Sequence, residues 1–327
     1  MNKETKRQHY VPRTYLDKFA VKRKKNFNIN AIEKNNLDKS KIIFPNINNV
    51  CIETDIYTLA GKTRAQRMAL ETFYSDNVEN VYNEVYQTLT DEKVTYITED
   101  LHYKIIMTII TMMYRTSKWI DRHNELFDSV LEKMYALCKQ TGQDSFMFEN
   151  INYSINGKTL KEIQTEFRNK GKEPQVLTQL EIAFKLIDIR KYDGIFVSKL
   201  DPGYQLITSD NPVILSNISQ DHIMPFDPEN MINMPLDSRH ILTIMPHSQS
   251  TRLHRIVRLT EGNILSQGKM MVNNTCQLTA SNKYILGSKS ALSHFIDNLD
   301  NYRKPISDEQ KKKLQEYEDL MKNLMQK

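Results

Sequence analysis

The chain has 327 residues, of which 39% are hydrophobic and 26% are charged, so it can build a substantial core and is not expected to be disordered. The charged start at 1–10 lacks the apolar stretch of a secretory signal, and the longest apolar run, 105–114, is shorter than the ~20 residues that cross a membrane. Three widely separated cysteines form neither a disulfide framework nor a CxxC metal motif. We therefore expect a cytoplasmic protein that makes no membrane contact.

The net charge of +5 is concentrated at the start of the chain. Residues 1–25 contain nine basic side chains, and only Glu4 and Asp17 oppose them. A basic segment of this kind, with its cluster at 23–25, could contact the phosphates of a nucleic acid or a nucleotide. A solvated basic loop is the alternative interpretation.

Hydrophobic spacing divides the chain into strand-like and helical stretches. Alternation predicts a strand at 27–32 and a shorter one at 42–44. Within 64–140, three helices are expected, because apolar residues recur every three or four positions, and Thr98 is the predicted N-cap of the second helix. Further helices are predicted at 177–191, 262–280, from 290 and at 307–326, and further strands at 194–200, 204–208, 213–215, 240–245 and 283–286.

Helices precede most strands, which favours an α+β fold over a regular βαβ repeat. We expect the helix-rich part, 64–191, to pack on a small mixed or antiparallel sheet from the strand-rich part, 192–288. Residues 1–300 would then form a single domain, and 301–327 a C-terminal amphipathic helix.

The short motifs of several enzyme classes are missing. The sequence has no GxxxxGK[ST] or GxGxxG phosphate loop, no GxSxG nucleophile elbow and no HExxH zinc motif, and its eight histidines are scattered. Arg115 and His123 come nearest to the Arg–His pair of a helical ribonuclease, but their separation of eight residues places them about two turns apart. That ribonuclease is a third hypothesis beside the two given below.

Helical geometry points some polar side chains toward apolar ones. At about 100° per residue, Glu71 lies in line with the apolar stripe that contains Val78, whereas Glu79 falls outside the stripe and is expected in solvent. A buried carboxylate needs a partner or a cation. Alternatively, Glu71 is exposed in the first helical turn, where the helix dipole favours it.

Three other positions leave similar alternatives open. Arg115 lies at the edge of the next helical stripe, where its head reaches either water or a buried carboxylate. His102 lies within that stripe and is expected to be a hydrogen-bonded core histidine rather than a ligand. Asp210 and Asn211 separate two strands, where turn chemistry explains them as readily as a functional site does.

Several stretches together resemble one bacterial family, domain-of-unknown-function family 4238. The segment 9–20, HYVPRTYLDKFA, looks like the opening of that family, although Arg13 stands where its members often have Gln. The likeness runs in order over about residues 8–288, and its further elements are Asp55-Ile56-Tyr57, Ala69-Leu70-Glu71, Tyr114-Arg115-Thr116, Thr208-Ser209-Asp210-Asn211-Pro212, Met234-Pro235-Leu236 and Val272-Asn273. The resemblance implies a shared polar pocket built from His9, Glu71, Arg115, Asp210 and Asn211.

The first functional hypothesis is a hydrolase that acts on nucleic acid or nucleotides, in a bacterial phage-defence or toxin-like setting. His9 would be the general acid or base, and Asp210 and Glu71 would complete the catalytic group and bind a divalent cation such as Mg²⁺ or Mn²⁺. The substrate-binding residues would be Arg13, Arg115, Asn211 and Tyr10.

The second hypothesis is a non-catalytic module that binds a ligand or a protein. In that case the same polar residues form a structural hydrogen-bond network, and the basic start of the chain and its charged end carry recognition.

Overall fold

The fold is seen in a computed structural model. It describes residues 6–59, 61–148, 151–217, 227–249 and 253–302, together with Lys312, Gln315, Glu316 and Asp319. The predicted C-terminal helix 301–327 lies almost entirely outside these residues. Among the helices described, none is long and apolar enough to cross a membrane.

The structure mixes short strands with longer helices, which confirms the α+β prediction. The strands are β1 (Arg7–His9), β2 (Val21–Arg23), β3 (Asn26–Asn28), β4 (Asn30–Glu33), β5 (Ile52–Thr54), β6 (Ser145–Phe148), β7 (Ile151–Ser154), β8 (Gly194–Lys199), β9 (Thr208–Ser209), β10 (Ile214–Ser216), β11 (Met231–Pro235), β12 (His240–Met245), β13 (Ile256–Thr260) and β14 (Tyr284–Gly287). The helices are α1 (Arg13–Leu16), α2 (Arg64–Arg67), α3 (Ala69–Tyr74), α4 (Asn80–Thr90), α5 (Glu99–Tyr114), α6 (Ser117–Thr141), α7 (Leu160–Arg190), α8 (Asn263–Ala280), α9 (Lys289–Asp297) and α10 (Leu299–Tyr302), with a π-helical turn, η3 (Ser75–Glu79), and 3-10 turns η1 (Lys39–Lys41), η2 (Ile47–Asn49) and η4 (His247–Gln249).

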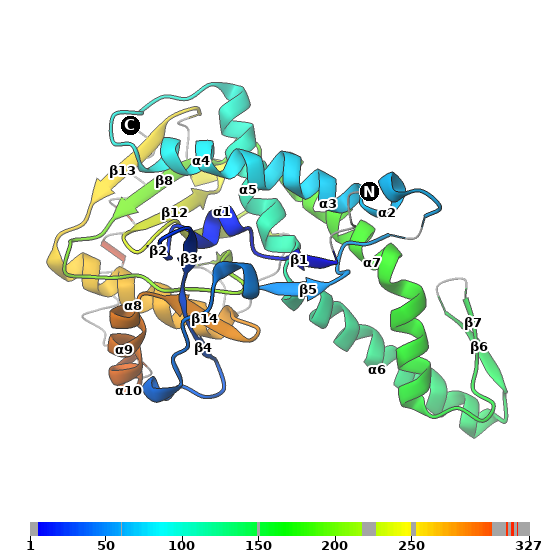
Figure 1. The fold of residues 1–327 in the computed structure, drawn as a ribbon. Coiled ribbons are helices and arrows are strands. Elements are labelled where there is room, and N and C mark those ends of the chain that lie inside the picture. Colours follow the sequence, from blue (N-terminus) through cyan, green and yellow to red (C-terminus); the bar gives the residue numbers. More distant parts are fainter. Residues whose placement is uncertain are drawn as a thin grey trace.

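A five-stranded mixed sheet lies on the left of Figure 1, in the order β10-β11-β12-β8-β13. Strand β13 runs parallel to β8, and the other neighbouring pairs are antiparallel. One face of the sheet, with Ile195 and Leu242, joins the main core of α4 and α5. On the other face Ile241 packs with Met270 of α8. The sheet therefore makes apolar contacts on both faces.

A second sheet, β4-β14-β9, brings distant parts of the chain together. Residues 30–33 pair with 284–287, and β14 also pairs with the two residues of β9. The strand predicted at 27–32 is divided between β3 and β4, and the stretch predicted at 42–44 contributes only an isolated bridge from Ile43 to Ala31. This second sheet holds the segment 209–212 against the turn that precedes β14.

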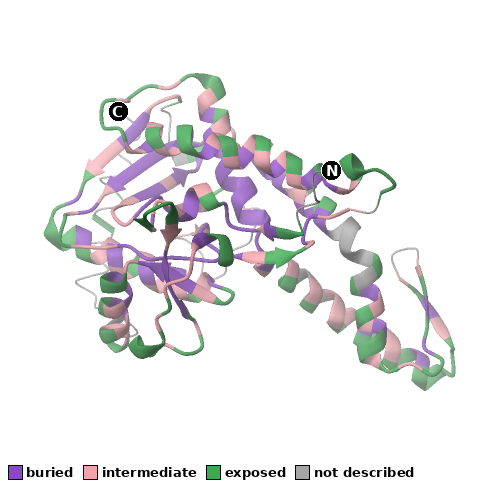
Figure 2. Ribbon diagram, viewed as in Figure 1, coloured by how far each residue is buried: buried purple, intermediate pink, exposed green. Residues whose placement is uncertain are grey.

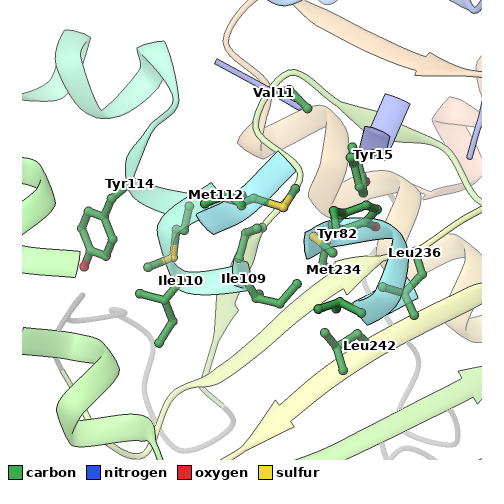
Figure 3. Close-up of a cluster of buried hydrophobic side chains, with 14 of the residues drawn as sticks. Val11, Tyr15, Tyr82, Ile109, Ile110, Met112, Tyr114, Met234, Leu236 and Leu242 are labelled. Carbon is green, nitrogen blue, oxygen red and sulfur yellow. The ribbon is translucent and has the colours of Figure 1, made fainter. Parts of the chain in front are cut away.

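The main core gathers around α5, as the buried residues in Figures 2 and 3 show. The predicted cap is confirmed, since the side chain of Thr98 accepts the N–H of Leu101. Ile109 is fully buried in this core with Tyr82 of α4 and Leu242 of the sheet. Burying a side chain of this size contributes about 2 kcal/mol, so α5 is a main source of stability.

Helices α6 and α7 extend away from the sheet and carry the β6–β7 hairpin at their far end (Figure 1). This arm has an apolar cluster of its own, which includes Leu131 of α6, Phe146 of β6 and Phe167 of α7. Helix α7 begins at a capping box formed by Thr159 and Glu162. The sequence predicted only its second part, because apolar spacing is weak in the charged stretch before residue 176.

The strands predicted at 194–200, 240–245 and 283–286 and the helix at 262–280 correspond to β8, β12, β14 and α8. The strand predicted at 204–208 is wrong, because only Thr208–Ser209 forms a strand. Instead, the N–H of Ile207 donates to the Asn274 side chain of α8, 2.9 Å away. A side-chain partner of this kind replaces the ladder that the apolar pattern predicted.

The core position predicted for His102 is confirmed, but the predicted hydrogen bonding is not, because neither ring nitrogen has a hydrogen-bond partner within the described residues. The buried ring leads to a pH dependence of stability. The residue is 1% exposed, and its ring lies 5.3 Å from that of His254. Burial, and to a smaller extent the charge of His254, lowers the pKa of His102 from 6.5 to about 4, while the backbone of Asp193 opposes the shift. Below about pH 6.5 the unfolded chain binds a proton that the folded one does not, so we expect roughly 3 kcal/mol of stability to be lost between about pH 6.5 and 4, measured by urea unfolding.

Two substitutions make this assignment specific. His102→Leu should flatten the decline, because the titrating ring is gone. His294→Gln, at an exposed histidine of α9, should leave the decline unchanged. An equally steep decline in His102→Leu would assign it to other groups.

Candidate functional site

A π-helical turn determines where Glu79 points. It is the last residue of η3, which joins α3 to α4, so the helix is not a continuous α-helix. The extra residue of a π-turn rotates everything after it by about 100° relative to an α-helix. The expectation that Glu79 faces solvent is therefore wrong, because its side chain is 21% exposed and its Oε1 lies 3.1 Å from Nη2 of Arg115.

Arg115, at the C-terminal end of α5, is a fully buried guanidinium. Besides Glu79, its Nη2 donates to the carbonyl oxygen of His9, 2.5 Å away. The guanidinium carbon lies 5.5 Å from the ring centroid of Tyr57 and 4.5 Å from that of Tyr74, which makes two cation–π contacts. Its Nε and Nη1 have no hydrogen-bond partner within the described residues. Of the two alternatives for Arg115, the buried one is therefore observed.

Glu71 lies near this arginine but makes no ion pair with it within the described part of the chain. Its Oε2 is buried and lacks a hydrogen-bond partner there. Burial raises the pKa of Glu71, and Arg115 opposes the shift while the like charge of Glu79 adds to it. Two carboxylates thus share the surroundings of one buried cation.

His9 ends β1 and is partly buried. Its Nε2 lies 3.1 Å from the carbonyl oxygen of Ile47, and because a carbonyl can only accept, Nε2 carries the proton and Nδ1 does not. Burial lowers the pKa of His9, which the bond to Ile47 opposes, so the ring is neutral near pH 7. Tyr10, the next residue, is buried, and burial raises the pKa of its hydroxyl far above the usual value.

A polar hollow of about 380 Å³ opens beside these residues, where α1, η2, η3 and the β2–β3 turn meet. We call it the N-terminal hollow. Most of its wall is polar, and the residues that line it are Arg13, Thr14, Asp17, Lys25, Asn26, Phe27, Asn46, Ile47, Asn48, Ser75, Glu79 and Asn80. Of the predicted site residues only Arg13 is in the wall, and His9 contacts the backbone carbonyl of the wall residue Ile47.

The two acidic side chains of the hollow have ion-pair partners, whereas its two basic side chains have none in the part of the chain that the structure describes. Asp17 pairs with Lys18 at 2.8 Å, and Glu79 pairs with Arg115 at 3.1 Å. Arg13 donates only to the Asn48 amide oxygen, at 3.3 Å, and Lys25 has no ion-pair partner within the described residues. Two cations are therefore left to attract an anion in the hollow.

Asp210 occupies a different environment. Its Oδ1 accepts the N–H of Asn282 at 2.8 Å, and its Oδ2 accepts those of Lys283 and Tyr284 at 2.6 and 2.9 Å. Burial raises the pKa of Asp210, and these three bonds oppose the shift. The carboxylate thus fixes the turn between α8 and β14, and its predicted catalytic role stays a prediction.

Asn211 connects the same region to the end of α5. Its Oδ1 accepts the hydroxyl of Thr116 at 3.0 Å, and its Nδ2 donates to the Ala280 carbonyl at 3.1 Å. Because Thr116 follows Arg115, the two predicted groups are linked through the backbone but not through a shared cavity. The structure therefore brings together His9, Arg13, Glu71 and Arg115, with Asp210 and Asn211 in a neighbouring structural network. The side chain of His123 lies outside the described residues.

The proposed metal ligands fit a shared cation poorly. Asp210 already accepts three backbone N–H groups, whereas Glu71 lies among Arg115, Glu79 and Arg13. In the part of the chain that the structure describes, no cluster of three or more His, Cys, Asp or Glu side chains is arranged to hold a metal. We assign no catalytic step to a metal, and metal binding by Glu71 and Asp210 stays a prediction.

Fold and site together define an α+β protein with an open polar hollow, in whose wall Glu79 pairs with the buried Arg115. The family model described as protein of unknown function (DUF4238) matches residues 7–291, so the chain belongs to this family. A search of curated proteins and a search of solved structures each found no match.

Proposed function

We propose that this protein is a hydrolase of nucleic acid or nucleotides and that the N-terminal hollow is its substrate site. The observation that carries the proposal is the uncompensated pair of cations, Arg13 and Lys25, in the same wall as Glu79. Arginine and lysine bind phosphate by charge-assisted hydrogen bonds. Amide side chains in the wall, such as Asn46 and Asn80, supply donors and acceptors for a sugar or a base.

The wall also offers a base for the hydrolytic step. Arg115 holds Oε1 of Glu79, which leaves Oε2 free of hydrogen bonds within the described residues. Oε2 takes a proton from a water molecule as the water oxygen bonds to phosphorus, the P–O bond to the leaving group breaks, and solvent water protonates the leaving oxygen. Glu79 thus takes the role predicted for His9, because Glu79 is in the wall of the hollow and His9 is not among the residues that line it.

The cellular setting belongs to the same proposal. The three cysteines are free thiols, two of them buried, which fits a reducing cytoplasm. Phage defence or a toxin-like action is the setting that the family resemblance led us to expect.

Hydrolysis can be tested with purified protein. RNA, DNA and nucleotides are incubated with Mg²⁺ or Mn²⁺, and Glu79→Gln should lower kcat by about 100-fold, because a positioned general base typically contributes that much. Arg13→Gln should instead raise KM, since it removes a phosphate contact. Glu132→Gln, at an exposed position of α6, is the matched control and should leave turnover unchanged.

Full turnover in both hollow variants would place the active centre elsewhere. The second hypothesis, a non-catalytic binding module, is favoured by one observation, the use of Asp210 as a backbone cap. Binding to the hollow without any turnover of these substrates would support that module over the hydrolase.

A further inference from the structure

The β2–β3 hairpin, residues 21–28, forms one rim of the N-terminal hollow. Its two strands pair in register from Val21–Asn28 to Arg23–Asn26, and within the described residues only an isolated bridge from Asn28 to Asn46 extends the pairing. Lys25, at the turn, and Asn26, which follows it, are in the wall of the hollow. A ligand that leaves the hollow on this side therefore passes along the hairpin.

Four consecutive cations, residues 22–25, occupy this hairpin, and all are exposed. The described residues provide no carboxylate within ion-pair distance of Arg23 or Lys24, as for Lys25. The acids of the hollow do not offset them, because Asp17 and Glu79 are paired with other cations. The rim is thus a positive path that continues the positive charge inside the hollow.

The turn itself favours a functional reading of this charge. Lys24 has φ of 55°, in the left-handed region, where a residue with a Cβ costs roughly 1 kcal/mol and glycine or asparagine is usual. A lysine there adds strain without burying any surface, since it is exposed. Backbone strain of this kind is found mainly at functional sites, where the side chain is needed for binding or catalysis.

Two aromatic rings accompany the cations. The guanidinium of Arg23 lies 4.7 Å from the ring centroid of Phe44, and Nζ of Lys22 lies 5.9 Å from that of Phe27. Phe27 is partly exposed and is in the wall of the hollow. Basic side chains next to aromatic rings form the kind of surface on which proteins hold single strands, with phosphates on the cations and bases on the rings.

We propose that the substrate of the hollow is a single-stranded polynucleotide, RNA or DNA, whose flanking phosphates lie on Arg23 and Lys24. The inference rests on the proposed function for the reaction but concerns binding outside the reacting phosphate. A free nucleotide would use Arg13 and Lys25 and would not reach the outer cations. Stacking on Phe27 needs a base that is not already paired and stacked in a duplex.

Fluorescence anisotropy tests this with a labelled mixed-sequence oligonucleotide of about 12 nucleotides, as RNA and as DNA, and a labelled mononucleotide. Binding is measured in the Glu79→Gln background, so that the probe is not cleaved. Arg23→Gln with Lys24→Asn should weaken oligonucleotide binding about tenfold and lower the slope of log affinity against log salt by about 1.4, for two phosphate contacts. Mononucleotide binding should not change. Asparagine tolerates the left-handed turn, so the variant is expected to fold.

The matched control removes two equal charges from the arm, Lys133→Gln with Lys139→Gln, both exposed on α6. It should leave both affinities unchanged. An equal loss in this control, or an oligonucleotide bound no more tightly than the mononucleotide, would overturn the inference. If nucleotides are hydrolysed but the oligonucleotide binds no more tightly than the mononucleotide, the inference fails and the proposed hydrolase stands. If single-stranded oligonucleotides bind through the hairpin but are not hydrolysed, the inference about binding stands and the proposed hydrolase fails.

Discussion

Arg115→Met is expected to lower the free energy of unfolding by about 3–5 kcal/mol, the cost of breaking a buried ion pair from one side. The substitution leaves Glu79 without its cation and removes the donor to the His9 carbonyl. It also removes two cation–π contacts, to Tyr57 and Tyr74. Urea unfolding monitored by circular dichroism measures the loss, and a change below about 1 kcal/mol would show that the arginine contributes little.

We also expect Arg115→Met to loosen the start of the chain more than the rest of the protein. Since Arg115 holds the His9 carbonyl, amide exchange of the β1–β5 ribbon should speed up more in Arg115→Met than the global loss explains. The control is a double-mutant cycle with Glu79→Leu, which removes the carboxylate as well. Because the uncompensated charge is then gone, the double variant should be more stable than the sum of the single losses predicts. Strict additivity would show that the two side chains do not interact.

This ion pair also shows where prediction from sequence ends. The apolar period placed Glu71 toward the core and Arg115 at the edge of a stripe, and both are found near one another. The same period assigned Glu79 to solvent, because it assumed α-helical geometry throughout. A π-turn leaves no mark in hydrophobic spacing, since the apolar residues on either side keep their own period. The sequence therefore allowed a buried Arg115 as one of two alternatives. It did not predict that Glu79 would be the carboxylate that pairs with this arginine.

The helices and strands were predictable where the hydrophobic spacing within the segment matches the structure that the segment adopts in the fold. Strand β12 is a short, mostly apolar run and α8 is long and periodic, and both were predicted within a residue or so. Strands β11 and β13 were missed although three of the five residues in each are apolar, because so short a run is ambiguous on its own and its pairing partners lie elsewhere, in β12 and β8. That Asn46, Ser75 and Lys25 line one hollow was not predictable from sequence, because they are polar residues of a loop, a π-turn and a hairpin turn and carry no periodic signal.

The segment 209–212 illustrates a third limit. The sequence left two interpretations of Asp210, a residue that stabilises its own turn and a catalytic residue, and the family resemblance favoured the second. The observed bonds reach Asn282, Lys283 and Tyr284, about seventy residues away in the chain. The carboxylate is thus a cap, but for a turn far along the sequence rather than for its own. Only the folded structure brings these distant N–H groups to the carboxylate, so sequence alone could not choose between the two roles.

Asp210→Ala is the second substitution with a large expected effect. It leaves three N–H groups without acceptors at a position where Asp210 is fully buried. Each unsatisfied donor costs about 1–3 kcal/mol, so we expect a total loss of at least about 3 kcal/mol. Asp210→Asn keeps one acceptor oxygen but turns an amide N–H₂ toward a donor, so its loss should be intermediate. Urea unfolding gives both values.

The comparison that separates a cap from a catalytic acid uses stability and turnover together. Asp188→Ala removes an exposed carboxylate whose partner is Lys191, and it should change stability by less than about 1 kcal/mol, since surface ion pairs contribute little. If Asp210 acts only as a cap, Asp210→Asn at low temperature, where the variant is still folded, should retain the wild-type kcat on any substrate that the protein hydrolyses. A stable but inactive Asp210→Asn would instead restore the catalytic role that the sequence predicted, because the turn would then be shown not to need the carboxylate.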